Sequence, residues 1–203
     1  MEKTVYTIGH STHPIDEFIQ ILKSFGIQQL FDVRTIPRSR HNPQFNMEEL
    51  RRVLPQQGVD YIHIAGLGGL RKTVKDSVNT AWKNASFRGF ADYMQTPEFT
   101  VALDDFITQA QRGGSVIMCA EAVPWRCHRT LIGDALLTRG FRVMDIFSAA
   151  SAKPQTLTPW ALVKGTLVTY PGSPAEADST TPAEGVVGED LNHDLVQVKQ
   201  SRV

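Results

Sequence analysis

The residues best suited to chemistry lie close together, in the stretch from 116 to 140. Its loop and first helical turn hold both cysteines of the chain, Cys119 and Cys127, together with a carboxylate, a histidine and two arginines. A short apolar run precedes Cys119, and apolar residues at helical spacing follow Cys127, so the stretch predicts a strand, a loop and a helix. The N-terminus of a helix presents unpaired amides and a partial positive charge. Cys127, flanked by Arg126 and His128, is therefore expected to be an acidic thiol that can act as a nucleophile.

The elements around this stretch must position its side chains, and their pattern predicts an α/β fold. Short apolar strands alternate with amphipathic helices, which is typical of a mostly parallel sheet with helices on both faces. We expect about five strands in a single domain. The strands are predicted at 5–8, 30–33, 61–64, 115–118 and 142–147.

Polar residues follow four of these predicted strands. Parallel strands end at the same edge of a sheet, and ligands bind beyond that edge, so we expect the side chains to form one site. Histidines and carboxylates there could transfer protons, arginines could hold a phosphate through paired hydrogen bonds, and glycines could let backbone amides approach a ligand. The residues expected to be catalytic are Cys127, Cys119, Glu121, His10 and Asp32. The residues expected to bind substrate are Ser11, Arg34, Arg38, His63, Gly68, Gly69, Arg71, Arg126, His128 and Arg129.

This set of residues favours an enzyme, of the hydrolase or transferase type, that acts on a phosphate-bearing substrate such as a nucleotide or a nucleic acid. Its partner would be an anionic small molecule or a nucleic acid. A second interpretation is a nucleotide- or nucleic-acid-binding module without catalysis. In that case Arg38 and a basic segment over 71–89, which lacks clear periodicity and is expected to be mobile, contact phosphates, and Trp82 stacks on bases.

A third interpretation is a zinc site, because cysteine and histidine are zinc ligands. The chain has no CxxC and no HxxxH pair. Two ligands adjacent in sequence, such as Cys127 and His128, rarely both reach one ion. The spacing therefore argues against a metal, and we expect no metal and no other cofactor.

Composition limits the remaining classes of protein. The chain has 203 residues, of which 41% are hydrophobic, and no apolar run approaches the ~20 residues of a membrane span. Two cysteines give no disulfide framework, so a cytoplasmic protein without a membrane association is expected. The net charge of zero divides into a mildly basic body and an acidic end. We expect an α/β domain over residues 1–170 and an acidic, disordered tail over 171–203.

Several multi-residue motifs occur in a characteristic order. They are Thr7-Ile8-Gly9-His10-Ser11, Asp32-Val33-Arg34, Leu67-Gly68-Gly69, Phe90-Ala91-Asp92-Tyr93-Met94, and Cys119-Ala120-Glu121 followed by Cys127-His128-Arg129. Over about residues 4 to 170 the chain resembles the bacterial family catalogued as domain of unknown function 488. The resemblance implies a compact α/β domain and draws attention to the motif positions, but it implies no reaction. The family often shows Val-x-His-Ile on its last core strand, where this chain has Val143-Met144-Asp145-Ile146, so Asp145 is expected to replace that histidine or its role is lost.

Overall fold

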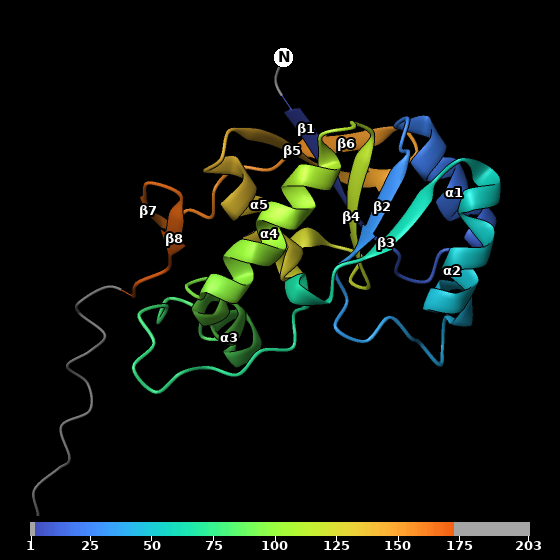
Figure 1. Ribbon diagram of the computed structural model, residues 1–203. Coiled ribbons are helices and arrows are strands. Elements are labelled where there is room, and N and C mark those ends of the chain that lie inside the picture. The colour runs from blue at the N-terminus through green and yellow to red at the C-terminus, as the bar shows by residue number, and fades with distance from the viewer. Residues whose placement is uncertain (1–2, 173–203) are drawn as a thin grey trace, which may run out of the picture. The chain divides into compact units, whose positions relative to one another are not determined.

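A six-stranded sheet forms the centre of the protein, as the computed structural model of residues 3–172 shows (Figure 1). The strands are β1 (Lys3–Gly9), β2 (Gln29–Asp32), β3 (Asp60–His63), β4 (Ser115–Cys119), β5 (Phe141–Ser148) and β6 (Ser151–Pro154). Their order across the sheet is β3-β2-β4-β1-β5-β6. The first five are parallel and β6 is antiparallel to β5. The predicted α/β fold with a mostly parallel sheet is therefore confirmed, and β6 is an edge strand that the sequence pattern did not reveal.

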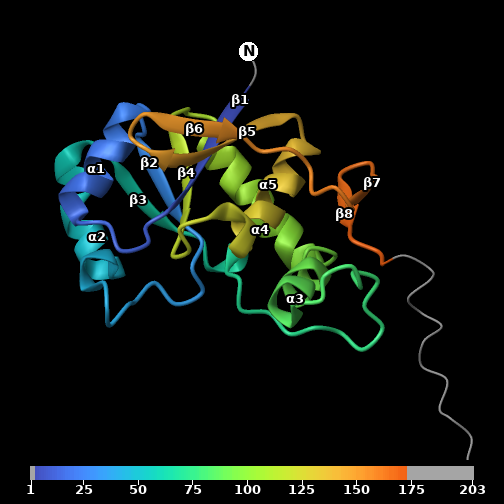
Figure 2. The ribbon, with the colours of Figure 1, turned by 180° about the vertical axis from the view of Figure 1, so that it is seen from behind.

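Helices cover both faces of the sheet (Figure 2). They are α1 (Ile15–Ser24), α2 (Met47–Val53), α3 (Ala85–Tyr93), α4 (Pro97–Ala110) and α5 (Arg129–Leu137). The alternation of side chains along β4 divides the core, since Val116 packs with α1 and α2 and Ile117 packs with α3, α4 and α5. This division explains why β4 reads as a continuous apolar run: both of its faces are buried.

The position of β4 between β1 and β2 brings the loops that follow these three strands together. The His10 amide donates to the Cys119 carbonyl at 2.9 Å, and the Ser11 amide donates to the Ala120 carbonyl at 2.9 Å. On the other side, the Val33 amide donates to the Met118 carbonyl at 3.0 Å. The predicted strand ends thus meet at one edge of the sheet.

A mobile basic segment was predicted over 71–89, but residues 85–89 belong to α3, and residues 71–84 are anchored by hydrogen bonds to the buried Asp92. Its carboxylate accepts from the Val74 amide at 3.0 Å, from the Asn79 side chain at 2.8 Å and from the Ser77 hydroxyl. Asn79 is fully buried. The segment therefore has a defined path, which apolar periodicity could not reveal because polar contacts determine it.

Local contacts determine where the helices begin. Helix α3 begins at Ala85 because the Asn84 side chain accepts from the first helical amides. Asn46 precedes α2 but makes no capping hydrogen bond, since its oxygen accepts from the Ser39 amide instead. The last helix of the domain, α5, begins two residues after Cys127.

The C-terminal part of the described chain forms a small separate hairpin. Its strands are β7 (Leu162–Lys164) and β8 (Leu167–Thr169), which pair only with each other within residues 3–172. The predicted acidic tail falls almost wholly outside the described residues. Among the described residues, no helix has the length and apolar character needed to cross a membrane.

Candidate functional site

A pocket of about 660 Å³ opens at the carboxyl ends of β1, β2 and β4. The pocket combines residues from six separate parts of the chain, which lie at 10–12, 34–42, 69–70, 86–87, 119–122 and 126–128. Of the site residues predicted from the sequence, those that line it are His10, Ser11, Arg34, Arg38, Gly69, Cys119, Glu121, Arg126, Cys127 and His128. Those that do not line it are Asp32, His63, Gly68, Arg71 and Arg129.

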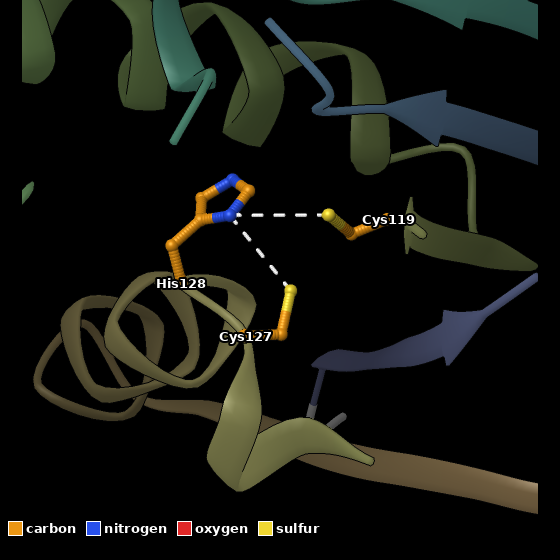
Figure 3. Close-up of side chains that lie close together, drawn as sticks. All are labelled: Cys119, Cys127 and His128. Carbon is orange, nitrogen blue, oxygen red and sulfur yellow. Dashed lines mark hydrogen bonds between the residues drawn. The ribbon is translucent and has the colours of Figure 1, made fainter. Parts of the chain in front are cut away.

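Cys119, Cys127 and His128 form a cluster in this pocket, with the two sulfurs and the Nδ1 atom pointing toward one another (Figure 3). The Nδ1 atom lies 3.9 Å from Sγ of Cys119 and 3.8 Å from Sγ of Cys127. All three atoms lie within 4.8 Å of one another. The sequence spacing argued against convergence of the adjacent residues Cys127 and His128, and the structure shows that they do converge.

A change of backbone conformation between these two residues makes the convergence geometrically feasible. Cys127 is extended, with φ −134° and ψ 142°. His128 is already helical, with φ −59° and ψ −16°. Side chains of successive residues alternate only within a regular strand, so this change lets both turn toward Cys119.

The orientation of the His128 ring determines which nitrogen carries the proton. The Nε2 atom lies 3.1 Å from the Val33 carbonyl oxygen and 3.1 Å from the Leu67 carbonyl oxygen. Carbonyl oxygens only accept, so Nε2 is the protonated nitrogen of the neutral ring. The Nδ1 lone pair is then directed at the two thiols.

A close backbone approach secures the same ring. A Cβ atom placed on Gly69 would lie 2.5 Å from Nδ1 of His128, well inside van der Waals contact. The glycine therefore makes room for the imidazole. Gly68 also packs closely, against Thr35. Both glycines were expected to expose amides to a ligand. The Gly68 amide donates to the Ala65 carbonyl at 3.0 Å, whereas Gly69 lines the pocket.

The two thiols differ in their acidity. A hydrogen bond from the Cys119 thiol lowers the pKa of Cys127 well below its ordinary value against the opposing effect of burial, and the nearby charge of Arg129 lowers it further. The same hydrogen bond to Cys127, together with burial, raises the pKa of Cys119. Cys127 is therefore the more acidic of the two, as expected from its neighbours in the sequence.

A second polar cluster lies on the other side of the pocket, around Arg34. Its guanidinium donates to the Asp32 carboxylate from Nε at 2.9 Å and also from Nη2. Nη2 donates in addition to the Phe45 carbonyl at 2.8 Å. The Tyr61 hydroxyl donates to Asp32 at 2.7 Å. Burial lowers the pKa of Arg34, but the hydrogen bond and charge of Asp32 outweigh it, so the net pKa is raised and the ion pair is maintained.

His10 completes the second cluster as a neutral ring. Its Nδ1 lies 2.9 Å from the Ser11 carbonyl oxygen, and its Nε2 lies 3.2 Å from Nη1 of Arg34. Nδ1 must therefore donate and Nε2 must accept. Burial, with the charge of Arg34, lowers the pKa of His10 to about 4. Its accepting nitrogen is engaged, which favours a positioning role over proton transfer.

Three predicted site residues hold the backbone of the pocket walls instead of facing the pocket. Arg129 is 1% exposed and donates to the carbonyls of Glu121 and Ala122, the latter at 3.0 Å. His63 bonds through Nε2 to the Arg34 carbonyl at 2.9 Å. Arg71 donates to carbonyls of the 65–68 loop and stacks on the Tyr93 ring, with its guanidinium carbon 3.7 Å from the ring centroid.

Several pocket residues were not singled out as site residues from the sequence. They are Thr12, Thr35, Ile36, Ser39, Asn42, Leu70, Ser86, Phe87, Ala120 and Ala122. Ile36 and Leu70 are 64% and 70% exposed, which is unusual for large apolar side chains. Two apolar residues in polar, glycine- or proline-containing loops were the signal that could have indicated a binding surface.

A model of the family described as a domain of unknown function, DUF488, matches residues 14–136, which is more than half of the chain. The chain belongs to the DUF488 family. The match confirms the resemblance noted in the motifs, and it includes both cysteines, His128, Asp32 and Arg34. A search of curated proteins and a search of solved structures each found no match. The DUF488 description names no activity, so the function must be argued from the site.

Asp145, where DUF488 proteins often have a histidine, lies beyond the matched range and does not line the pocket. It is buried and accepts a hydrogen bond from the Thr7 hydroxyl. Burial raises the pKa of Asp145, whereas the hydrogen bond of Thr7 and the nearby charge of Arg129 lower it. In this DUF488 protein the aspartate thus lies behind the site, against β1 and Arg129.

Proposed function

We propose that this DUF488 protein is an enzyme, of the hydrolase or transferase type, that acts on a phosphate-bearing substrate such as a nucleotide or a nucleic acid. The observation that carries the proposal is the combination, in one pocket, of a surplus of cations with the cluster of Cys119, Cys127 and His128. The pocket volume lies within the range of about 300–1,000 Å³ usual for small-molecule sites.

The charges of the pocket favour an anion. Arg34, Arg38 and Arg126 line it, against a single carboxylate, Glu121. Arg34 is neutralised by Asp32, but Arg38 and Arg126 are exposed and lie free to turn toward a ligand, apart from a 3.7 Å pair between Arg38 and Glu48. Guanidinium groups bind phosphate through paired hydrogen bonds.

The apolar part of the pocket favours a substrate that also carries a flat ring. Phe87 lines the wall, and its ring is stacked on Trp82 with the centroids 4.7 Å apart. Ile36 and Leu70 add exposed apolar surface. A nucleobase can stack on such a surface while its phosphate reaches the arginines.

The reacting group is expected in the cysteine and histidine cluster. It combines an acidic thiol with an imidazole of defined tautomer, and both face the same cavity as the arginines. Groups of this kind carry out nucleophilic or acid–base steps. His10, in contrast, is expected to hold Arg34 in place.

Binding and turnover should be measured together. Isothermal titration with a nucleoside 5′-monophosphate, the matching nucleoside and a short single-stranded oligonucleotide measures affinity, and chromatography of the mixtures measures turnover. We expect the phosphate compounds to bind more tightly than the nucleoside. Arg38→Ala and Arg126→Ala should each weaken binding about tenfold, whereas Arg142→Ala, an exposed arginine at the opposite end of the sheet, should not.

The outcomes separate the interpretations. Turnover that is lost in Cys127→Ser while binding remains supports the enzyme. Binding of phosphate compounds without turnover of any of them would show a non-catalytic binding module. Equal affinity for the nucleoside and its phosphate, or no binding of either, would overturn the proposal.

A further inference from the structure

We propose that Cys119, Cys127 and His128 bind a zinc ion whose fourth coordination position faces the pocket. The metal site itself stands on the geometry of these three residues. Its use in catalysis rests on the proposed function, which it deepens by placing a metal-bound water or a substrate oxygen at the reacting position.

The distances between the three donor atoms fit a tetrahedral ion. With zinc–sulfur and zinc–nitrogen bonds of about 2.3 and 2.0 Å, tetrahedral angles place a sulfur and a nitrogen about 3.5 Å apart. The observed separations from Nδ1 of His128 are 3.9 Å to Cys119 and 3.8 Å to Cys127. Movements of a few tenths of an ångström would therefore complete the site.

The hydrogen bonding of the cluster also fits a cation at its centre. The Nδ1 atom of neutral His128 has one lone pair, yet two sulfurs face it. The Cys119 thiol donates to Cys127, so at most one thiol, that of Cys127, donates to this lone pair. A cation between the three atoms would be bound by the lone pairs of all of them.

His128 has the outer contacts of a metal-binding histidine. In metal sites the distal ring nitrogen usually donates to a carbonyl or a carboxylate, which fixes the ring and the tautomer. Here Nε2 lies between the carbonyl oxygens of Val33 and Leu67. The edge of the Phe90 ring packs against the imidazole, with the centroids 4.9 Å apart, and Gly69 leaves room for it.

The loop that joins the two cysteines is also held in place. The buried Arg129 donates to the carbonyls of Glu121 and Ala122, between Cys119 and Cys127. The Cys127 amide donates to the Pro124 carbonyl at 2.9 Å. A site prepared in this way loses little conformational freedom when it binds an ion.

The types of donor atom indicate which metal binds, and the position of the cluster in the pocket indicates what the metal does. Two thiolates and an imidazole suit zinc, whereas calcium and magnesium require oxygen ligands. Zinc sites with four protein ligands are structural, while three protein ligands and an open position are typical of catalytic sites. All three residues line the pocket, so the open position would be accessible to a substrate.

The test uses the full chain, purified under reducing conditions without a histidine tag. Elemental analysis after incubation with zinc sulfate and gel filtration should give about one zinc per chain. Cys119→Ser, Cys127→Ser and His128→Ala should each lower the zinc content at least tenfold. His41→Ala, which changes an exposed histidine outside the cluster, should leave the zinc content unchanged.

Cobalt substitution provides a second measurement. The wild-type protein loaded with Co²⁺ should show thiolate-to-cobalt charge-transfer absorption and the visible bands of a tetrahedral ion, and each cysteine variant should weaken the charge-transfer band. Added inorganic phosphate should shift the visible bands if the open position faces the pocket. Circular dichroism shows whether each variant is folded. For a variant that does not fold, alkylation of the wild-type cysteines, slow with zinc and fast with a chelator, serves in its place.

The results distinguish this inference from the proposed function. A protein that binds neither zinc nor cobalt, or that binds them equally well in the three variants, overturns the zinc site. If such a metal-free protein still turns over a nucleotide, the proposed function stands without zinc. If zinc binds as expected but phosphate compounds do not, the metal site stands and the proposed function fails.

Discussion

Two buried polar clusters border the same pocket, one around Arg34 and one formed by Cys119, Cys127 and His128. In the Arg34 cluster, Asp32, His10 and the Phe45 carbonyl accept from the guanidinium at distances of ordinary hydrogen bonds. In the cysteine cluster, three atoms with lone pairs face one another, and Nδ1 of His128 lies 3.9 and 3.8 Å from the two sulfurs.

This difference indicates that the Arg34 cluster supports the structure and that the cysteine cluster can react. The Arg34 cluster is complete within the chain, so its contribution is to hold the pocket wall and to fix the charge there. The cysteine cluster has bonding capacity directed at a common point, which an ion or a substrate can use. A buried polar group is thus better assessed by what its lone pairs face than by its residue type.

Among variants that test the difference between the two clusters, Asp32→Ala is expected to change the free energy of unfolding most. The variant leaves the Arg34 charge buried without its carboxylate, so the free energy of unfolding should fall by about 3–5 kcal/mol in urea titrations. Glu49→Ala, which removes the partner of the exposed Arg52, is the matched control and should change it little. If both variants lose similarly little free energy of unfolding, Asp32 is not needed to balance the buried charge of Arg34.

Arg129→Met tests the support of the cysteine cluster. The variant keeps the apolar stem but removes the donors to the Glu121 and Ala122 carbonyls, at a cost of about 1.5–3 kcal/mol in the free energy of unfolding. Alkylation of Cys119 should become faster, because the loop beside it is no longer held. Arg126→Met, an exposed arginine of the same loop, should alter stability little. Unchanged alkylation in the Arg129 variant would show that the loop needs no such support.

The pH dependence of stability tests the neutral state of His10. Its pKa is about 4 in the folded protein against about 6.5 in the unfolded chain. Below pH 6.5 the unfolded chain binds a proton that the folded protein excludes, so stability is full above this pH and is lost as the pH falls toward 4. Between pH 7.5 and 5 the loss attributable to His10 should be about 2 kcal/mol.

Chemical unfolding at several pH values in the wild type and in His10→Gln provides the measurement. The variant should lack this part of the decline and retain the part due to other groups. Parallel curves for the two proteins would mean that His10 titrates normally and that burial and the charge of Arg34 do not hold it neutral.

The smallest effect on stability is expected from Arg38→Ala at the rim. Arg38 and Glu48 are 71% and 66% exposed and lie 3.7 Å apart, so their pair should contribute less than about 1 kcal/mol to the free energy of unfolding. Thermal denaturation should show almost no shift, while the affinity for phosphate compounds falls. A large loss of stability would show that Arg38 supports the fold, as Arg34 and Arg129 do, and would argue against a role in ligand binding.

Sequence patterns were sufficient for the parallel strands of the sheet and for the edge at which the site lies. Apolar runs and helical spacing located the five parallel strands, and polar residues at their ends indicated a common rim. The same patterns could not resolve the segment at 71–84, because its path depends on polar contacts with Asp92. They also missed β6, a short edge strand with partly exposed side chains.

The sequence by itself determined which chemical groups gather at the rim of the sheet, because the order of strands and helices places every strand end of a parallel sheet on one side. Only the tertiary structure decided which of these groups face the pocket. Arg34 and Arg129 are of the same residue type and both follow strands, yet Arg34 lines the pocket and Arg129 is sealed behind a loop. The directions of such side chains depend on neighbours remote in sequence, as Gly69 and the Val33 carbonyl show for His128.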